Sequence, residues 1–194
     1  QLGVGHVVGC ANGTDAIELA LRASGLQPGQ KVLTTPLSAF ATTLAILRAG
    51  GQPLFVDVDE SGLLDLEQAE EALRAEPSIA AFVPVHLYGH CLDLNRLEAL
   101  TARYGVTLIE DCAQAVGARS AGRTAGTVGS YASFSFYPTK NLGAFGDGGA
   151  TAAQDAEGAH KLQALRNYGQ TERYRHDLFG VNSRLDEVHA AILH

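Results

Sequence analysis

The sequence predicts an α/β domain of three layers, in which a mostly parallel sheet lies between two layers of helices. Short runs of β-branched and apolar residues alternate with amphipathic segments of helical period along almost the whole chain. Strands joined in this way by helices run parallel and are covered on both faces. The 194 residues, 46% of them hydrophobic, are sufficient for one domain with a sizeable core.

The first part of the chain contains three predicted strands and two helices. The apolar run at 6–11 predicts a strand, and the helical pattern at 13–25 ends at a glycine, which suits the left-handed conformation found after helix ends. Runs at 31–35 and 53–58 predict strands on either side of a helix at 39–51.

The same alternation continues through the second part. Each predicted helix has apolar residues at helical spacing, and each predicted strand is a short run of mainly apolar residues. The predicted helices are 66–75, 94–105 and 155–169, and the predicted strands are 79–85, 106–113, 130–136 and 148–153.

Composition excludes several classes of partner. The net charge is −7 and no block of basic residues is present, which argues against nucleic acid and anionic membranes. No apolar run reaches membrane-spanning length, and the first residues do not resemble a signal peptide. The three cysteines, Cys10, Cys91 and Cys112, are widely spaced, which argues against a disulfide framework and favours a reducing cytoplasm.

Both ends of the sequence indicate a piece of a longer chain. It begins at Gln1 and contains no methionine, and a helical pattern that includes Leu185 and Leu193 continues to the end without a stop signal. We therefore expect an internal fragment.

Three junctions after predicted strands carry residues suited to chemistry, because ligands of such sheets bind at the carboxyl ends of the strands. In "ANGTDAIELAL", Asn12, Gly13 and Thr14 stand where a strand leads into a helix. Free N–H groups at a helix start attract phosphate, and the alternative is a plain helix cap by Asn12 or Thr14.

The second junction is "LIEDCAQA", where Asp111 follows a strand that should be buried. A buried aspartate is costly unless a cation or several donors meet it, and the alternative is a cap of a following helix. Gln114 faces the same space if the segment turns helically.

The third junction is "FSFYPTKNLGAFGDGG", where Lys140 stands between a strand and a glycine-rich turn. A solvated turn lysine is one interpretation. A lysine in a partly desolvated pocket is the other, and it can form a Schiff base. Pyridoxal phosphate would connect all three junctions, because it needs a phosphate site, an acid for its ring nitrogen and a lysine for its aldehyde.

Taken together, these motifs with "PVHLYG", "LRNYGQ" and "NSRLDEVHAAIL" resemble the DegT/StrS family of pyridoxal-phosphate-dependent nucleotide-sugar aminotransferases, across nearly all of the chain. The resemblance implies the large domain of the type I aspartate aminotransferase fold over 1–194, incomplete at its N-terminus and without the small C-terminal domain. It implies a homodimer with shared active sites, and transfer of an amino group from glutamate to a keto-deoxysugar linked to a nucleoside diphosphate, typically dTDP.

The resemblance also implies a role for each site residue. Lys140 would be the Schiff-base lysine and proton shuttle, Asp111 the partner of the protonated pyridine nitrogen, and Gln114 a contact of the ring hydroxyl or ring face. The remaining implied roles are phosphate contacts by Gly13, Thr14 and Ser135, ring stacking by Phe40, and a contact of Asn182 with the phosphate of the neighbouring subunit's cofactor.

Other patterns are weaker. "HLYGHC" offers His86, His90 and Cys91, but a second pair of zinc ligands is missing, so we expect loop residues at the rim of the cleft and no metal. "GVGHVVG" has Val8 where a dinucleotide fingerprint needs its third glycine. Two rival functions are a sugar dehydratase of the same family, which lacks the lysine, and a non-catalytic regulatory protein on the same scaffold.

Overall fold

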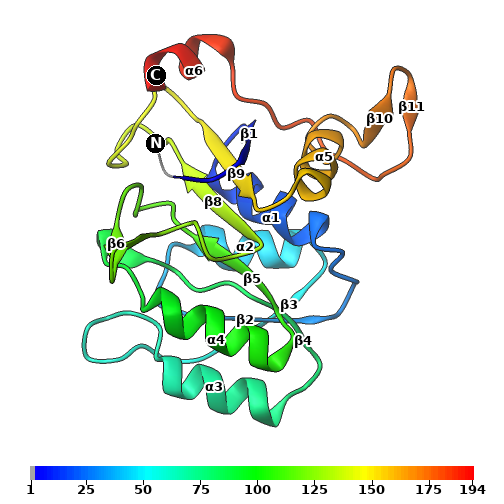
Figure 1. Ribbon diagram of the computed structural model, residues 1–194. Helices are drawn as coiled ribbons and strands as arrows, with labels where there is room; N and C mark the ends of the chain where they lie inside the picture. The colour runs from blue at the N-terminus through cyan, green and yellow to red at the C-terminus, as the bar shows by residue number, and fades with distance from the viewer. Residues whose placement is uncertain (1–2) are drawn as a thin grey trace.

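A seven-stranded sheet forms the centre of the computed structural model, which describes residues 3–194 (Figure 1). Gln1 and Leu2 lie outside the described residues. Every strand pair in the sheet is parallel except the two that β9 makes with its neighbours. In spatial order the strands are β1 (His6–Cys10), β9 (Gly149–Ala153), β8 (Tyr131–Ser135), β5 (Thr107–Asp111), β4 (Ile79–Phe82), β2 (Lys31–Thr34) and β3 (Gln52–Phe55).

Helices cover both faces of this sheet, which confirms the predicted α/β class (Figure 1). Because successive strand residues point to opposite faces, Val32 packs with one helix layer and Leu33 with the other. In the same way, Ile109 packs with the same helix layer as Val32, and Leu108 packs with the same layer as Leu33. One layer contains α1 (Gly13–Ala23), α2 (Phe40–Arg48) and α5 (Ala156–Leu165), and the other contains α3 (Leu66–Ala75) and α4 (Leu94–Tyr104).

Side-chain caps fix where several helices begin. Asp65 and Asp93 each accept hydrogen bonds from two backbone N–H groups in the first turn of α3 and α4, and Asp155 accepts one from Gly158 N in α5. Such caps satisfy donors that have no intrahelical partner. Helix α4 ends at Gly105, whose φ of 66° lies in the left-handed region that glycine adopts without strain.

Four short strands and a 3₁₀ turn are found where the sequence predicted none, whereas the last helix, α6 (Glu187–Leu193), lies within the predicted helical pattern near the end of the chain. Two small hairpins are β6 (Arg119–Ser120) with β7 (Arg123–Thr124), and β10 (Gln170–Glu172) with β11 (Arg175–His176). A single 3₁₀ turn, η1 (Leu87–Gly89), follows β4.

Strand β4 is shorter than the predicted strand 79–85, but the residues that follow it still help to position the site. Beyond Phe82 the chain pairs once more with β5, through the bridge between Val85 and Asp111. His86 N donates to Asp111 O at 3.0 Å, and Asp111 N donates to Pro84 O at 2.9 Å. These bonds fix the backbone at the carboxyl end of β5. Among residues 3–194, no helix is both long and apolar enough to cross a bilayer.

Candidate active site

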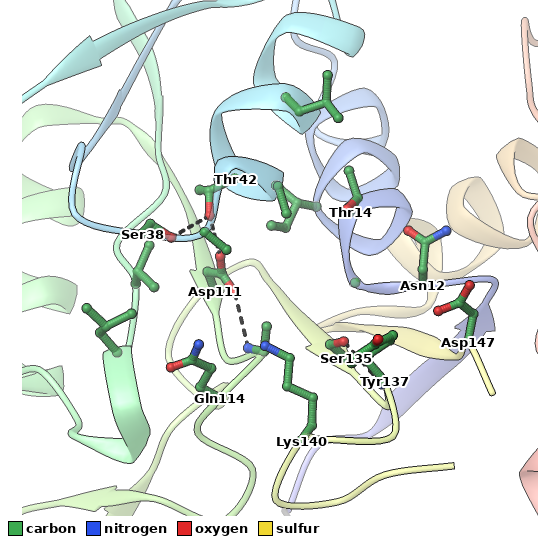
Figure 2. A pocket seen from close by; sticks show the side chains of 18 of the residues that line it. Asn12, Thr14, Ser38, Thr42, Asp111, Gln114, Ser135, Tyr137, Lys140 and Asp147 are labelled. Carbon is green, nitrogen blue, oxygen red and sulfur yellow. Dashed lines mark hydrogen bonds between the residues drawn. The ribbon is translucent and has the colours of Figure 1, made fainter. Parts of the chain in front are cut away.

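A pocket of about 390 Å³ lies at the carboxyl ends of β5 and β8, between α1 and α2 (Figure 2). Six predicted site residues line it: Gly13, Thr14, Asp111, Gln114, Ser135 and Lys140. They come from three separate parts of the chain, so only the fold brings them together. Figure 2 shows the labelled side chains of Thr14, Asp111, Ser135 and Lys140 around one common space.

The start of α1 forms one wall of the pocket. Asn12 Oδ1 accepts from Asp15 N at 2.8 Å, so Asn12 caps the helix and Thr14 does not. The N–H groups of Gly13 and Thr14 precede the first intrahelical hydrogen bond, which Ala16 N donates to Asn12 O. Donors at such a helix start, together with the helix dipole, favour an anion such as phosphate.

Ser135 completes this wall because position 13 is a glycine. A Cβ on Gly13 would lie 2.7 Å from Ser135 Cβ, which is closer than side chains can pack. The absence of that atom lets the end of β8 approach the helix start. Two backbone donors and two hydroxyl groups, those of Thr14 and Ser135, are thereby gathered on one side of the pocket.

Asp111 stands at the end of β5 with only 3% of its surface exposed. Its carboxylate accepts hydrogen bonds from Thr42 Oγ1 at 2.9 Å and from Ala113 N at 3.1 Å. Burial raises the pKa of this carboxyl above its usual value. The segment after it is a turn rather than a helix, so Asp111 does not cap one. A cationic partner in the pocket would therefore stabilise its ionised form.

Glu110, beside Asp111, forms a buried connection on the other face of the sheet. Its carboxylate accepts from Gly126 N, Val128 N and Gly129 N at 2.8 Å each, and it lies 3.0 Å from His86 Nε2. Leu92 N lies 3.2 Å from His86 Nδ1, and His86 Nε2 faces Glu110.

The expectation that His86 lies at the cleft rim is therefore wrong, because its side chain is completely buried in this connection. His90 is exposed and Cys91 is half-buried. Ligand atoms of His86, Glu110 and Cys112 lie within 4.8 Å of one another. However, Glu110 is already satisfied by four donors, and burial raises the pKa of the Cys112 thiol well above its usual value. The side chains of His86, Glu110 and Cys112 are therefore suited to hydrogen bonding rather than to binding a metal ion.

Lys140 lies on the turn after β8, where Lys140 N donates to Tyr137 O at 2.8 Å. A Cβ on Gly143 would lie 2.6 Å from Pro138 O, so the tight turn requires glycine at that position. The side chain of Lys140 is half-buried and lines the pocket, as Figure 2 shows. Gln114 lies beside it, with Oε1 accepting from Tyr88 N at 2.9 Å.

Two predicted site residues do not line this pocket. Phe40 is the first residue of α2 and is 69% exposed, although its neighbours Ala39 and Ala41 line the pocket. Asn182 is exposed and forms a β-bridge with Asn167. Ring stacking by Phe40 and the contact of Asn182 with a second subunit stay predictions.

Several lining residues were missed by sequence reasoning, and Thr42 is the most informative. It is a buried hydroxyl on a helix that is otherwise largely apolar, and it bonds both to Asp111, 69 positions away, and to Ser38 Oγ at 2.9 Å. The other missed polar residues of the pocket are Ser38, Arg48, Tyr137 and Asp147.

The groups that line the pocket suit a ligand with a particular set of functional groups. One wall offers N–H and hydroxyl donors that suit an anion, the buried carboxylate of Asp111 lies at the end of β5, and the primary amine of Lys140 lines the pocket from the turn after β8. A ligand with a phosphate at one end, a basic ring nitrogen and a reactive carbonyl would satisfy all three.

Comparisons with known proteins agree with this interpretation. The model of the DegT/DnrJ/EryC1/StrS aminotransferase family matches residues 1–194. The chain is 51% identical over 193 residues to dTDP-3-amino-3,4,6-trideoxy-alpha-D-glucose transaminase of Micromonospora megalomicea subsp. nigra. It is 47% identical over 192 residues to a UDP-N-acetyl-3-dehydro-alpha-D-glucosamine 3-aminotransferase of Acidithiobacillus ferrooxidans. It is 47% identical over 189 residues to a "Pleiotropic regulatory protein" of Geobacillus stearothermophilus.

Each of these matches covers 97–98% of the chain but only 50–52% of the relative. The chain thus spans about half the length of the curated relatives it matches. Among solved structures, that of DesV from S. venezuelae superposes with a TM-score of 0.94 at 46% identity, and the match covers 99% of this chain and 52% of DesV.

Proposed function

Since the chain belongs to the DegT/DnrJ/EryC1/StrS aminotransferase family, we propose that the whole protein is a pyridoxal-phosphate-dependent aminotransferase. It takes the amino group of glutamate and transfers it to a keto group on a nucleotide-linked deoxysugar, which leaves 2-oxoglutarate and an aminosugar. The observation that carries this proposal is the meeting of the α1 start, Asp111 and Lys140 in one pocket.

Each wall of the pocket has a function in this scheme. Bound pyridoxal phosphate supplies a carbonyl that carries the amino group and a ring that accepts electrons. Gly13, Thr14 and Ser135 bind the phosphate through N–H and hydroxyl donors. Asp111 keeps a proton on the ring nitrogen, because its buried carboxylate is stabilised by a positive charge. Lys140 Nζ would hold the cofactor covalently through its carbonyl carbon, with loss of water, and once released would move a proton to and from the substrate carbon.

For the nucleotide, we propose dTDP. The support is the name of the relative with 51% identity, a dTDP-sugar transaminase, whereas a relative with 47% identity is named for a UDP-sugar. A direct comparison of binding of the two nucleotides to the full-length protein decides between them.

The proposed function predicts a simple spectroscopic result. Full-length protein purified with its cofactor should be yellow, and glutamate should bleach the visible absorbance as the cofactor becomes aminated. Adding a keto-deoxysugar nucleotide should then restore it. A regulatory protein on the same scaffold would show no bleaching with glutamate, and that result would contradict the proposal.

The proposed shared site makes a second prediction, for a homodimer in which Asn182 serves the partner's cofactor. Full-length Lys140→Ala and Asn182→Ala homodimers should each be strongly impaired. In their heterodimer both defects fall in one site, so the other site is intact and activity should return.

A mixture of Lys140→Ala with Asp111→Asn is the matched control. These two residues line the same chain's pocket, so each site of that heterodimer carries one defect and no activity should return. Subunit exchange is verified by native mass spectrometry. Equal behaviour of the two mixtures after confirmed exchange would rule out a shared site.

A further inference from the structure

The phosphate wall of the pocket, formed by Gly13, Thr14 and Ser135, adjoins an ion pair that the proposed chemistry does not use. In this pair Arg48 Nη1, at the end of α2, lies 3.2 Å from Asp15 Oδ1 in the first turn of α1. Arg48 also lines the pocket, whereas Asp15 is only 8% exposed. The carboxylate of Asp15 is thus largely removed from water and depends on Arg48 for its charge balance.

A second acid of α1 completes this network. Glu18 is 1% exposed, and its two carboxylate oxygens lie 2.7 Å from Arg48 Nε and 2.7 Å from Arg22 Nη2. Two acids and two arginines therefore balance one another between α1 and α2. A buried acid that loses its cation is strongly destabilising, so the network holds the end of α2 against α1.

Asp15 is fixed close to the phosphate wall by its hydrogen bonds. Ser183 Oγ donates to Asp15 Oδ2 at 2.7 Å and accepts from Ala11 N at 2.9 Å, just before α1 begins. Asp15 N donates to Asn12 Oδ1 at 2.8 Å. Asp15 also directly follows Thr14, one of the proposed phosphate contacts. The carboxylate is therefore held near the place where an anion would bind.

The charge of Asp15 opposes the proposed function of this wall. A helix N-terminus attracts anions, so a carboxylate and a phosphate in the same first turn compete for one positive end, and they also repel each other. Among the described residues that line the pocket, the cations are Lys140 and Arg48. Since Lys140 is proposed to hold the carbonyl, Arg48 is the cation that can offset Asp15.

We propose that Arg48 is a positioning residue for the cofactor phosphate, which it serves by neutralising Asp15, an inference that rests on the proposed function. The pairing lets Asp15 keep its bond to Ser183, and through it the bond to Ala11 N, without an unbalanced negative charge beside the phosphate. It also fixes the separation of α1 and α2, which line the pocket from two sides.

The test measures cofactor binding rather than turnover. Full-length protein freed of its cofactor is titrated calorimetrically with pyridoxamine phosphate and with pyridoxamine, which lacks the phosphate. Neither ligand has a carbonyl, so Lys140 does not bond to it, and the ratio of the two dissociation constants reports on the phosphate. Arg48→Gln should weaken binding of pyridoxamine phosphate about tenfold and leave that of pyridoxamine unchanged.

Replacing Asp15 separates charge balance from structure. Asp15→Asn alone should bind pyridoxamine phosphate about threefold more tightly than wild type, because a repelling charge is lost. In the double variant Arg48→Gln with Asp15→Asn, two neutral amides replace the ion pair, so affinity should return to within about twofold of wild type. The difference between wild type and Arg48→Gln should also narrow at about 1 M salt, which screens charges.

Arg103→Gln is the matched control, because Arg103 on α4 forms a pair with Glu70 of α3 at 2.7 Å, away from the pocket. It should alter binding of neither ligand. Equal losses for both ligands in Arg48→Gln would show a purely structural role and overturn the proposal. So would a double variant that stays as weak as Arg48→Gln, since Arg48 would then contact the phosphate directly.

If Arg48→Gln does not fold, Asp15→Asn decides alone, and weaker binding of pyridoxamine phosphate than in wild type would contradict the proposal. The proposed function is tested separately by wild type. If wild type showed no preference for the ligand that carries a phosphate, the phosphate wall and the proposed function would fail, and this inference with them.

Discussion

Replacing Asp111 with asparagine in the full-length protein is expected to lower turnover about 10²–10³-fold. An amide is neutral, so it cannot favour a protonated ring nitrogen, whereas the buried carboxylate of Asp111 can. The phosphate wall is unchanged, so cofactor content should stay close to normal. Turnover is measured with saturating glutamate, and cofactor content is measured by absorbance after alkaline release.

Asp155→Asn is a matched control, because Asp155 is an aspartate whose side chain caps α5, bonding to Gly158 N at 2.7 Å. It should keep normal turnover. If Asp111→Asn also kept normal turnover, the acid would be needed only for its bonds to Thr42 and Ala113 N.

Replacing Lys140 is expected to have the larger effect, a loss of about 10⁴-fold, at the upper end of what one acid–base group contributes. Lys140→Ala removes the amine, and Lys140→Arg keeps the positive charge but offers no group that deprotonates near neutral pH. Both should be equally impaired if the amine is essential. Recovery in Lys140→Arg would show that charge alone is needed.

Lys161→Ala provides the control for Lys140. Lys161 lies on α5 and forms an exposed pair with Glu157 at 2.8 Å, away from the pocket. Its replacement should leave activity unchanged, since such pairs contribute little to stability.

The regular elements could be predicted because local patterns determine them. Helix α3 matches the predicted range 66–75, since apolar spacing and the Asp65 cap agree on its start. The seven-stranded sheet followed from alternation of strands and helices. The hairpins β6–β7 and β10–β11 were missed because strands of two or three residues leave no detectable period.

The candidate site was predictable where motifs carry it and not where distant side chains meet. Gly13, Asp111 and Lys140 stand in recognisable junctions, and the fold brings them together. The bond of Thr42 to Asp111 and the buried pair of His86 and Glu110 join residues 69 and 24 positions apart. No local pattern indicates such contacts, because only the packed structure creates them.

If Lys140 holds the cofactor, borohydride should fix the cofactor to this residue. Reduction of the yellow full-length protein should fix the cofactor to one lysine, which peptide mass spectrometry then identifies. Within this chain the candidates are Lys31, Lys140 and Lys161. The added mass should be found on the peptide that contains Lys140 and on neither of the others. Label on Lys31 or Lys161, or no label on a protein that is yellow, would contradict it.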